Sequence, residues 1–112
     1  MSKTLSKQVL LSVRALLSDS NRWTQFEQAR SLAGTPCPLF NREAMSFCLV
    51  GAIKRLAYGF SENDGGRLAA GLIERLEQRL SLRGDRRDCA AYNDTVSHGQ
   101  IIELVDEVLM AL

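Results

Sequence analysis

The sequence lacks any long hydrophobic run, which excludes a membrane-spanning helix. The apolar stretch at residues 9–13 is followed directly by Arg14, so it is too short and too amphipathic for the core of a signal peptide. No stretch approaches the roughly 20 apolar residues that cross a bilayer. We therefore expect a cytoplasmic protein that makes no membrane contact.

Cysteine and histidine are too few for a disulfide framework or a zinc site. The three cysteines, Cys37, Cys48 and Cys89, are an odd number at irregular spacing, and His98 is the one histidine. No C-x-x-C pair, P-loop, G-x-G-x-x-G, G-x-S-x-G or H-E-x-x-H motif occurs. We expect neither a metal nor a cofactor.

The chain also lacks a strong excess of charge of one sign, since its formal net charge is +1. Nucleic-acid binding is therefore not favoured, and it stays a third hypothesis through a strip of arginines at residues 75–87. These arginines alternate with acidic residues, which is more typical of a salt-bridged surface. The strip comprises Arg75, Arg79, Arg83, Arg86 and Arg87.

The chain does contain helical periodicity over most of its length. Its 112 residues suit a single domain, residues 1–112. We predict a mostly α fold: a compact bundle of four main helices around a buried central helix. The helices are expected at residues 4–17, 42–57, 66–82 and 97–112.

The predicted central helix starts from local signals. Asn41 is a good N-cap, and Phe40 and Met45 could pack as a hydrophobic staple. The following segment, AMSFCLVGAI, is apolar nearly all round, which is typical of a buried helix. This prediction puts Cys48 about two turns inside the helix.

The two later helices have simpler patterns. Leu68, Leu72, Leu76 and Leu80 form one row of the third helix. Ser97 and Gln100 have the spacing of a capping box at the start of the last helix. The polar residues just before Ser97 are expected to form a turn.

Residues 22–40 are predicted to form an irregular or β-hairpin insertion. Residues 24–32 could form a short helix, but Pro36 and Pro38 make a continuous helix beyond Gly34 unfavourable. We favour an extended arm that turns at residues 33–35.

Cys48, His98 and either Asn93 or Asp94 supply the residue types of a thiol-nucleophile triad. They are the weak catalytic candidates, and a thiol-dependent enzyme is the first alternative function. A cysteine inside a helix lacks the activation that a helix N-terminus provides, so we favour Cys48 as a small core residue. We lean toward a protein that is not an enzyme.

The leading hypothesis is a small intracellular accessory protein that docks on a protein partner. Trp23 is the single tryptophan, and such residues often anchor interfaces. The polar segment around residues 92–98 is the second part of the expected docking surface. The binding candidates are Trp23, Tyr92, Asn93, Asp94 and His98.

Three motifs resemble those of an uncharacterised "domain of unknown function" family of small bacterial and phage proteins. They are Trp23-Thr24-Gln25, Ala44-x-x-Phe47-Cys48-Leu49-x-Gly51-Ala52-Ile53, and Tyr92-Asn93-Asp94. The resemblance spans most of the chain, although Pro36, Cys37 and Pro38 are not part of the pattern. It implies a small α-rich domain of phage or mobile-element origin, and it implies no activity.

Overall fold

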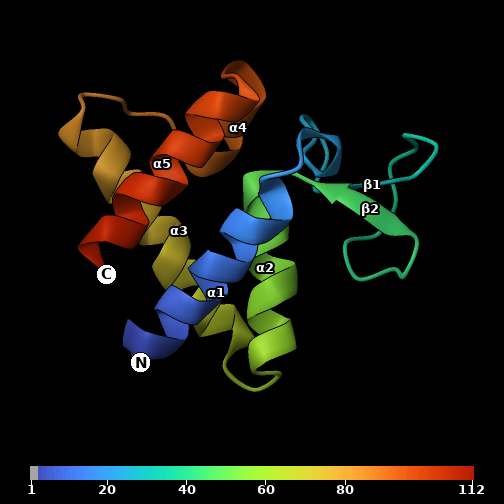
Figure 1. Ribbon diagram of the computed structural model, residues 1–112, viewed down its shortest axis with the longest axis horizontal. Coiled ribbons are helices and arrows are strands. Elements are labelled where there is room, and N and C mark those ends of the chain that lie inside the picture. The colour runs from blue at the N-terminus through green and yellow to red at the C-terminus, as the bar shows by residue number, and fades with distance from the viewer. Residues whose placement is uncertain (1–2) are drawn as a thin grey trace.

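The computed structural model describes residues 3–112 and is mostly helical (Figure 1). The helices are α1 (Lys3–Leu17), α2 (Leu49–Phe60), α3 (Gly65–Leu82), α4 (Cys89–Thr95) and α5 (His98–Ala111), and η1 (Ser20–Arg22) is a 3₁₀ turn. The strands β1 (Ala29–Ser31) and β2 (Ala44–Phe47) form a small antiparallel sheet. The predicted class, a helical bundle with a hairpin insertion, is confirmed.

The helical core is built around α2, which packs against α1 and α3, while α5 packs against α1 and α3 as well. The sheet lies at one edge of this bundle, on the side opposite the C-terminal end of α5 (Figure 1). The leucine row of α3 is fully buried, as its spacing predicts. Its members are Leu68, Leu72, Leu76 and Leu80.

The predicted start of the central helix is wrong. Residues 44–47 form strand β2, with Ala44 and Phe47 buried and Met45 exposed, and α2 begins only at Leu49. The Asn41 side chain accepts a hydrogen bond from the Glu43 N–H at 2.8 Å and so stabilises a turn, not a helix. Residues 44–47 pair with β1 although their local signals favour a helix. The pairing gives their backbone N–H and C=O groups hydrogen-bond partners on a distant segment of the chain.

The arm, defined here as residues 23–47, is extended and irregular, and the short helix considered at residues 24–32 does not form. Its turn lies at the predicted place: Gly34 has φ +84° and donates its N–H to the Ser31 carbonyl at 2.9 Å. A positive φ is accessible to glycine at little cost. An isolated antiparallel bridge between Arg30 and Pro36 joins the segments on the two sides of this turn.

The segment just before the last helix differs from the prediction as well. It forms α4 because the Asp88 side chain accepts the Ala91 N–H at 2.8 Å and caps a short helix. Asn93 and Asp94 therefore lie within a helix, not in a turn. The Ser97–Gln100 capping box of α5 is confirmed.

None of the helices within residues 3–112 is both long enough and apolar enough to cross a membrane.

Candidate functional site

Asn93 connects three parts of the chain beneath the arm. Its Oδ1 accepts the Trp23 indole N–H at 2.7 Å and the Leu49 backbone N–H at 3.0 Å. Its Nδ2 donates to the Thr24 carbonyl at 3.0 Å. Asn93 is 0% exposed, so these hydrogen bonds satisfy a polar group that would otherwise be costly to bury.

Further hydrogen bonds join the arm to α4. One carboxylate oxygen of Asp94 accepts the Phe26 backbone N–H at 2.8 Å, and Phe26 is held at φ +71°. The Gln25 side-chain amide donates to the carbonyls of Asn93 and Val96 at 3.0 and 3.1 Å, which would otherwise lack partners at the end of α4. The three motifs noted in the sequence thus meet at one junction.

Cys48 is the N-cap of α2, so its expected position two turns inside the helix is wrong. Its Sγ accepts the Gly51 N–H at 3.3 Å, and burial raises the pKa of the thiol even though nearby backbone N–H groups act in the opposite direction. The thiol lines a cavity of about 220 Å³ together with Phe26 and Asp94. A thiol in this environment is protonated and weakly nucleophilic at neutral pH.

His98 lies apart from this cavity. Its Nε2 is 2.5 Å from the Leu17 carbonyl oxygen, and its ring is tilted 47° against Trp23 at a centroid distance of 5.7 Å. Between residues 3 and 112 no hydrogen bond joins His98 to Cys48. The sulfur–imidazole hydrogen bond that a thiol triad requires is therefore not among the contacts of the described residues.

The predicted docking residues divide into buried and accessible ones. Tyr92 is 3% exposed and Asn93 is fully buried, so neither can contact a partner directly in this conformation. Trp23, Asp94 and His98 are half-buried. Of the predicted binding residues, only these three are accessible to a partner, and docking through them stays a prediction.

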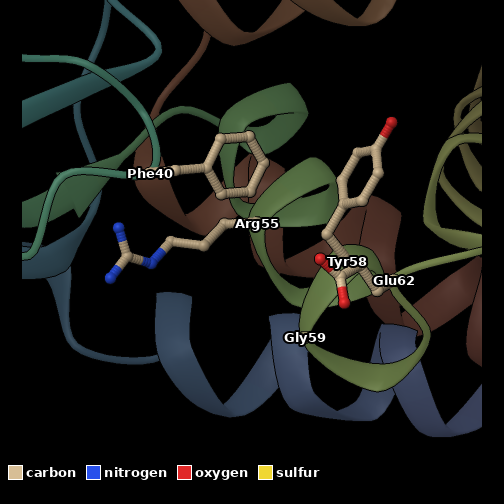
Figure 2. A pocket seen from close by; sticks show the side chains of 5 residues that line it. All are labelled: Phe40, Arg55, Tyr58, Gly59 and Glu62. Carbon is tan, nitrogen blue, oxygen red and sulfur yellow. The ribbon is translucent and has the colours of Figure 1, made fainter.

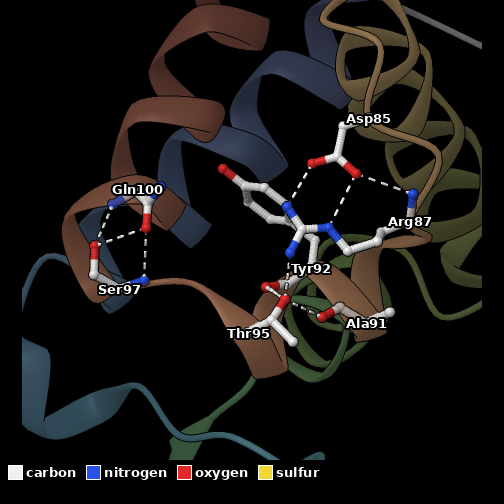
Figure 3. Close-up of polar contacts among 7 residues, drawn as sticks. All are labelled: Asp85, Arg87, Ala91, Tyr92, Thr95, Ser97 and Gln100. Carbon is white, nitrogen blue, oxygen red and sulfur yellow. Dashed lines mark hydrogen bonds and ion pairs between the residues drawn. The ribbon is translucent and has the colours of Figure 1, made fainter.

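The arginine strip is partly neutralised by ion pairs. Arg79 and Arg83 both contact the Glu107 carboxylate. Arg87 pairs with Asp85 at 2.6 Å, donates to the Thr95 hydroxyl at 2.6 Å and lies over the Tyr92 ring (Figure 3). The Arg87 side chain lowers the pKa of Asp85 to about 2.

An aromatic groove lies where the arm meets α2, and sequence reasoning missed it. Phe40 and Tyr58 pack edge to face, with ring centroids 5.5 Å apart. With Arg55, Gly59 and Glu62 they line an open cavity of about 660 Å³ (Figure 2). An adjoining cavity of about 420 Å³ shares the two rings and includes Lys54. The predicted staple of Phe40 with Met45 is wrong, since Phe40 packs against Tyr58.

Two features fix the geometry of this groove. Arg55 donates to the carbonyls of Leu39 and Asn41 at 2.7 and 3.0 Å, so it holds the Phe40 segment against α2. Gly65 leaves room for the Tyr58 ring, because a Cβ at residue 65 would lie 2.5 Å from it. The signal in the sequence was weak: two aromatic residues, Phe40 and Tyr58, separated by the strand β2.

No group of three or more potential metal ligands occurs within the described residues. Cys37, Cys48 and Cys89 are all free thiols.

These features define a small, mostly helical protein whose irregular arm is anchored by a buried asparagine. The chain belongs to a family described as "Family of unknown function (DUF6197)", whose model matches residues 1–109. The sequence resemblance to an uncharacterised family is thereby confirmed. No curated protein and no solved structure matches the chain.

Proposed function

We propose that this protein is a non-enzymatic binding module that docks on a protein partner through the outer face of the arm. The observation that carries the proposal is the uneven distribution of exposed apolar side chains. Nine large hydrophobic side chains are exposed among the described residues, and six of them lie on the arm or the last turn of α2. The six are Phe26, Leu32, Phe40, Met45, Tyr58 and Phe60.

Two of the six, Phe40 and Tyr58, pack against each other, and exposed apolar side chains that gather in one place are typical of an interaction surface. The arm is also held firmly from beneath, by Asn93, Asp94 and Arg55. A surface that is ordered before binding loses less conformational entropy when a partner docks. This supports docking over a role in which the arm folds only on contact.

The alternative of a thiol-dependent enzyme has less support. Burial raises the pKa of the Cys48 thiol, and the His98 ring is engaged with the Leu17 carbonyl. Nucleic-acid binding through residues 75–87 also has less support, since three of the five arginines are ion-paired. We keep the cytoplasmic location and the phage or mobile-element origin as parts of the proposal. Fractionation of host cells and the identity of the neighbouring genes test them.

The test is a comparison of three baits in host lysate. The full chain, a Phe40→Ala/Tyr58→Ala variant and a Leu82→Ala/Met110→Ala variant are immobilised, and the captured proteins are identified by mass spectrometry. Leu82 and Met110 are 79% and 89% exposed and lie away from the arm, so they are a matched control. We expect a partner on the full chain and the control that is lost from the Phe40/Tyr58 variant.

Capture that does not differ among the three baits would contradict docking through this face. Retention of a small molecule with no protein would contradict the proposed function as a whole. Circular dichroism of each bait establishes that the substitutions leave the fold intact.

A further inference from the structure

The aromatic groove combines apolar walls with charged side chains in both of its cavities. Phe40 and Tyr58 lie between its two cavities. Glu62 and Arg55 line the larger cavity, and Lys54 lines the smaller one. The rings can accommodate an apolar side chain, while the two cations beside them favour a negatively charged group.

The positive charge of Lys54 has no ion-pair partner in the described part of the chain. Among residues 3–112, Lys54 forms no salt bridge, and neither does Arg55. The guanidinium of Arg55 is engaged with the carbonyls of Leu39 and Asn41 and lies 5.2 Å from the Phe47 ring centroid. Lys54 and Arg55 thus give the groove two positive charges without a carboxylate partner among the described residues, against the single negative charge of Glu62.

The smaller cavity is lined in part by apolar side chains. They belong to Leu39, Ala69, Ala70 and Ile73, and Leu39 and Ile73 are packed against the core. Small side chains from α3 keep the groove open beside Tyr58. A cavity of about 420 Å³ has room for a side chain the size of leucine or phenylalanine. Its mainly apolar lining with few polar groups is typical of a ligand site.

We infer that this groove binds an acidic, apolar segment of the protein partner, with an apolar side chain against Phe40 and Tyr58 and an Asp or Glu beside Lys54. The inference rests on the proposed docking function and specifies the chemistry of the docked segment. Positive charge without an internal counter-ion, next to exposed aromatic rings, is complementary to such a segment. Glu62 shares the larger cavity with Arg55, so the carboxylate of the bound segment is expected at Lys54, in the smaller cavity.

The test selects peptides from a random twelve-residue mRNA-display library on the immobilised full chain. Enriched peptides are synthesised, and their affinities are measured by fluorescence anisotropy. We expect a shared apolar or aromatic position with Asp or Glu nearby, and binding that weakens about tenfold in a Lys54→Glu variant, since a reversed charge costs on the order of one factor of ten in affinity. Lys7→Glu is the matched control, because Lys7 is an exposed lysine on α1.

A second selection, on the Lys54→Glu variant, should replace the acidic residues of the enriched peptides by Lys or Arg. Retained binding to Tyr58→Ala would show that the peptides bind elsewhere, which overturns both this inference and the docking surface. Binding lost in Tyr58→Ala but unchanged in Lys54→Glu would overturn the acidic chemistry and leave the docking function standing. No enrichment would overturn both.

A second copy of this chain is the competing occupant. Light scattering that shows a concentration-dependent dimer, abolished by Tyr58→Ala, would overturn the inference in favour of self-association. A monomer at all concentrations, together with the acidic peptide preference, would support the inference.

Discussion

At the scale of single residues, Asn93 is the buried polar side chain of the described part of the chain. It is fully buried and joins Trp23, Thr24 and Leu49 by hydrogen bonds. A buried amide with all of these contacts specifies one arrangement of the arm, since any displacement would leave polar groups without partners.

Replacing Asn93 by alanine should therefore destabilise the protein strongly. The Trp23 indole N–H and the Leu49 backbone N–H would both lose their acceptor, and we expect a loss of about 3 kcal/mol in the free energy of unfolding. Urea denaturation followed by tryptophan fluorescence measures it. Asn63→Ala, at an exposed asparagine, should stay within about 0.5 kcal/mol. Equal stability of both variants would contradict the proposed role of Asn93.

Asp85 gives a prediction about pH. Arg87 lowers the pKa of Asp85 from 3.8 to about 2. The ion pair with Arg87 therefore stabilises the folded protein fully above the unfolded-state pKa of Asp85, and this contribution is lost as the pH falls from about 4 to about 2. In Arg87→Ala the pKa of Asp85 should return toward 3.8. Carboxyl carbon chemical shifts followed by NMR across this range test it. Arg86→Ala, at the neighbouring exposed arginine, should leave the titration unchanged.

At the scale of elements, the arm and α2 depend on a very close approach of two backbones. Gly51 lies in the first turn of α2, and a Cβ at this position would lie 2.2 Å from the Gln28 carbonyl oxygen. The same region holds the N-cap at Cys48, whose backbone N–H donates to that carbonyl at 3.3 Å. The missing side chain of Gly51 therefore allows the backbone of the arm at Gln28 to lie directly against α2.

Two glycine-to-alanine substitutions should consequently have opposite effects. Gly51→Ala should destabilise the protein by about 1–3 kcal/mol, because the backbone at Gln28 must move to accommodate the new methyl group. Gly71→Ala, on α3 with nothing within 4 Å of its Cβ position, should stabilise by up to about 1 kcal/mol through helix propensity. Thermal and urea unfolding measure both. Stabilisation by both substitutions would contradict the close approach.

At the scale of the whole molecule, the protein consists of a helical bundle with an irregular arm held along one edge (Figure 1). The α2 helix belongs to both parts, since it packs against α1 and α3 and also contacts β2. Arg55 extends from α2 to the arm by hydrogen bonds to Leu39 and Asn41. Local opening of the arm near Phe40 thus depends mainly on these two hydrogen bonds.

Arg55→Met should loosen the arm while leaving the bundle intact. Loss of two hydrogen bonds to the chain near Phe40 should accelerate amide exchange at residues 39–43 about tenfold. Hydrogen–deuterium exchange with mass spectrometry measures the change, and peptides from α1, α3 and α5 should exchange at the rate of the unmodified chain. Arg67→Met, at an exposed arginine on α3, is the control. Faster exchange throughout the protein would show instead that Arg55 stabilises the whole fold.

The sequence alone determined the elements whose signals are local. The leucine row of α3 and the capping box of α5 depend on residues at most a few turns apart, so periodicity and spacing predicted both helices. The turn at Gly34 was predictable for the same reason, since glycine and the nearby prolines constrain the backbone within a few residues.

Only the tertiary structure decided the strand at residues 44–47, the position of Cys48, and the meeting of Trp23 with Asn93. The Trp23–Asn93 pair joins residues 70 positions apart, and the strand exists because β1 offers it partners. Local propensity favoured a helix over residues 44–47, and long-range backbone pairing outweighed it. The aromatic groove has the same origin, because Phe40 and Tyr58 meet only once the arm has folded against α2.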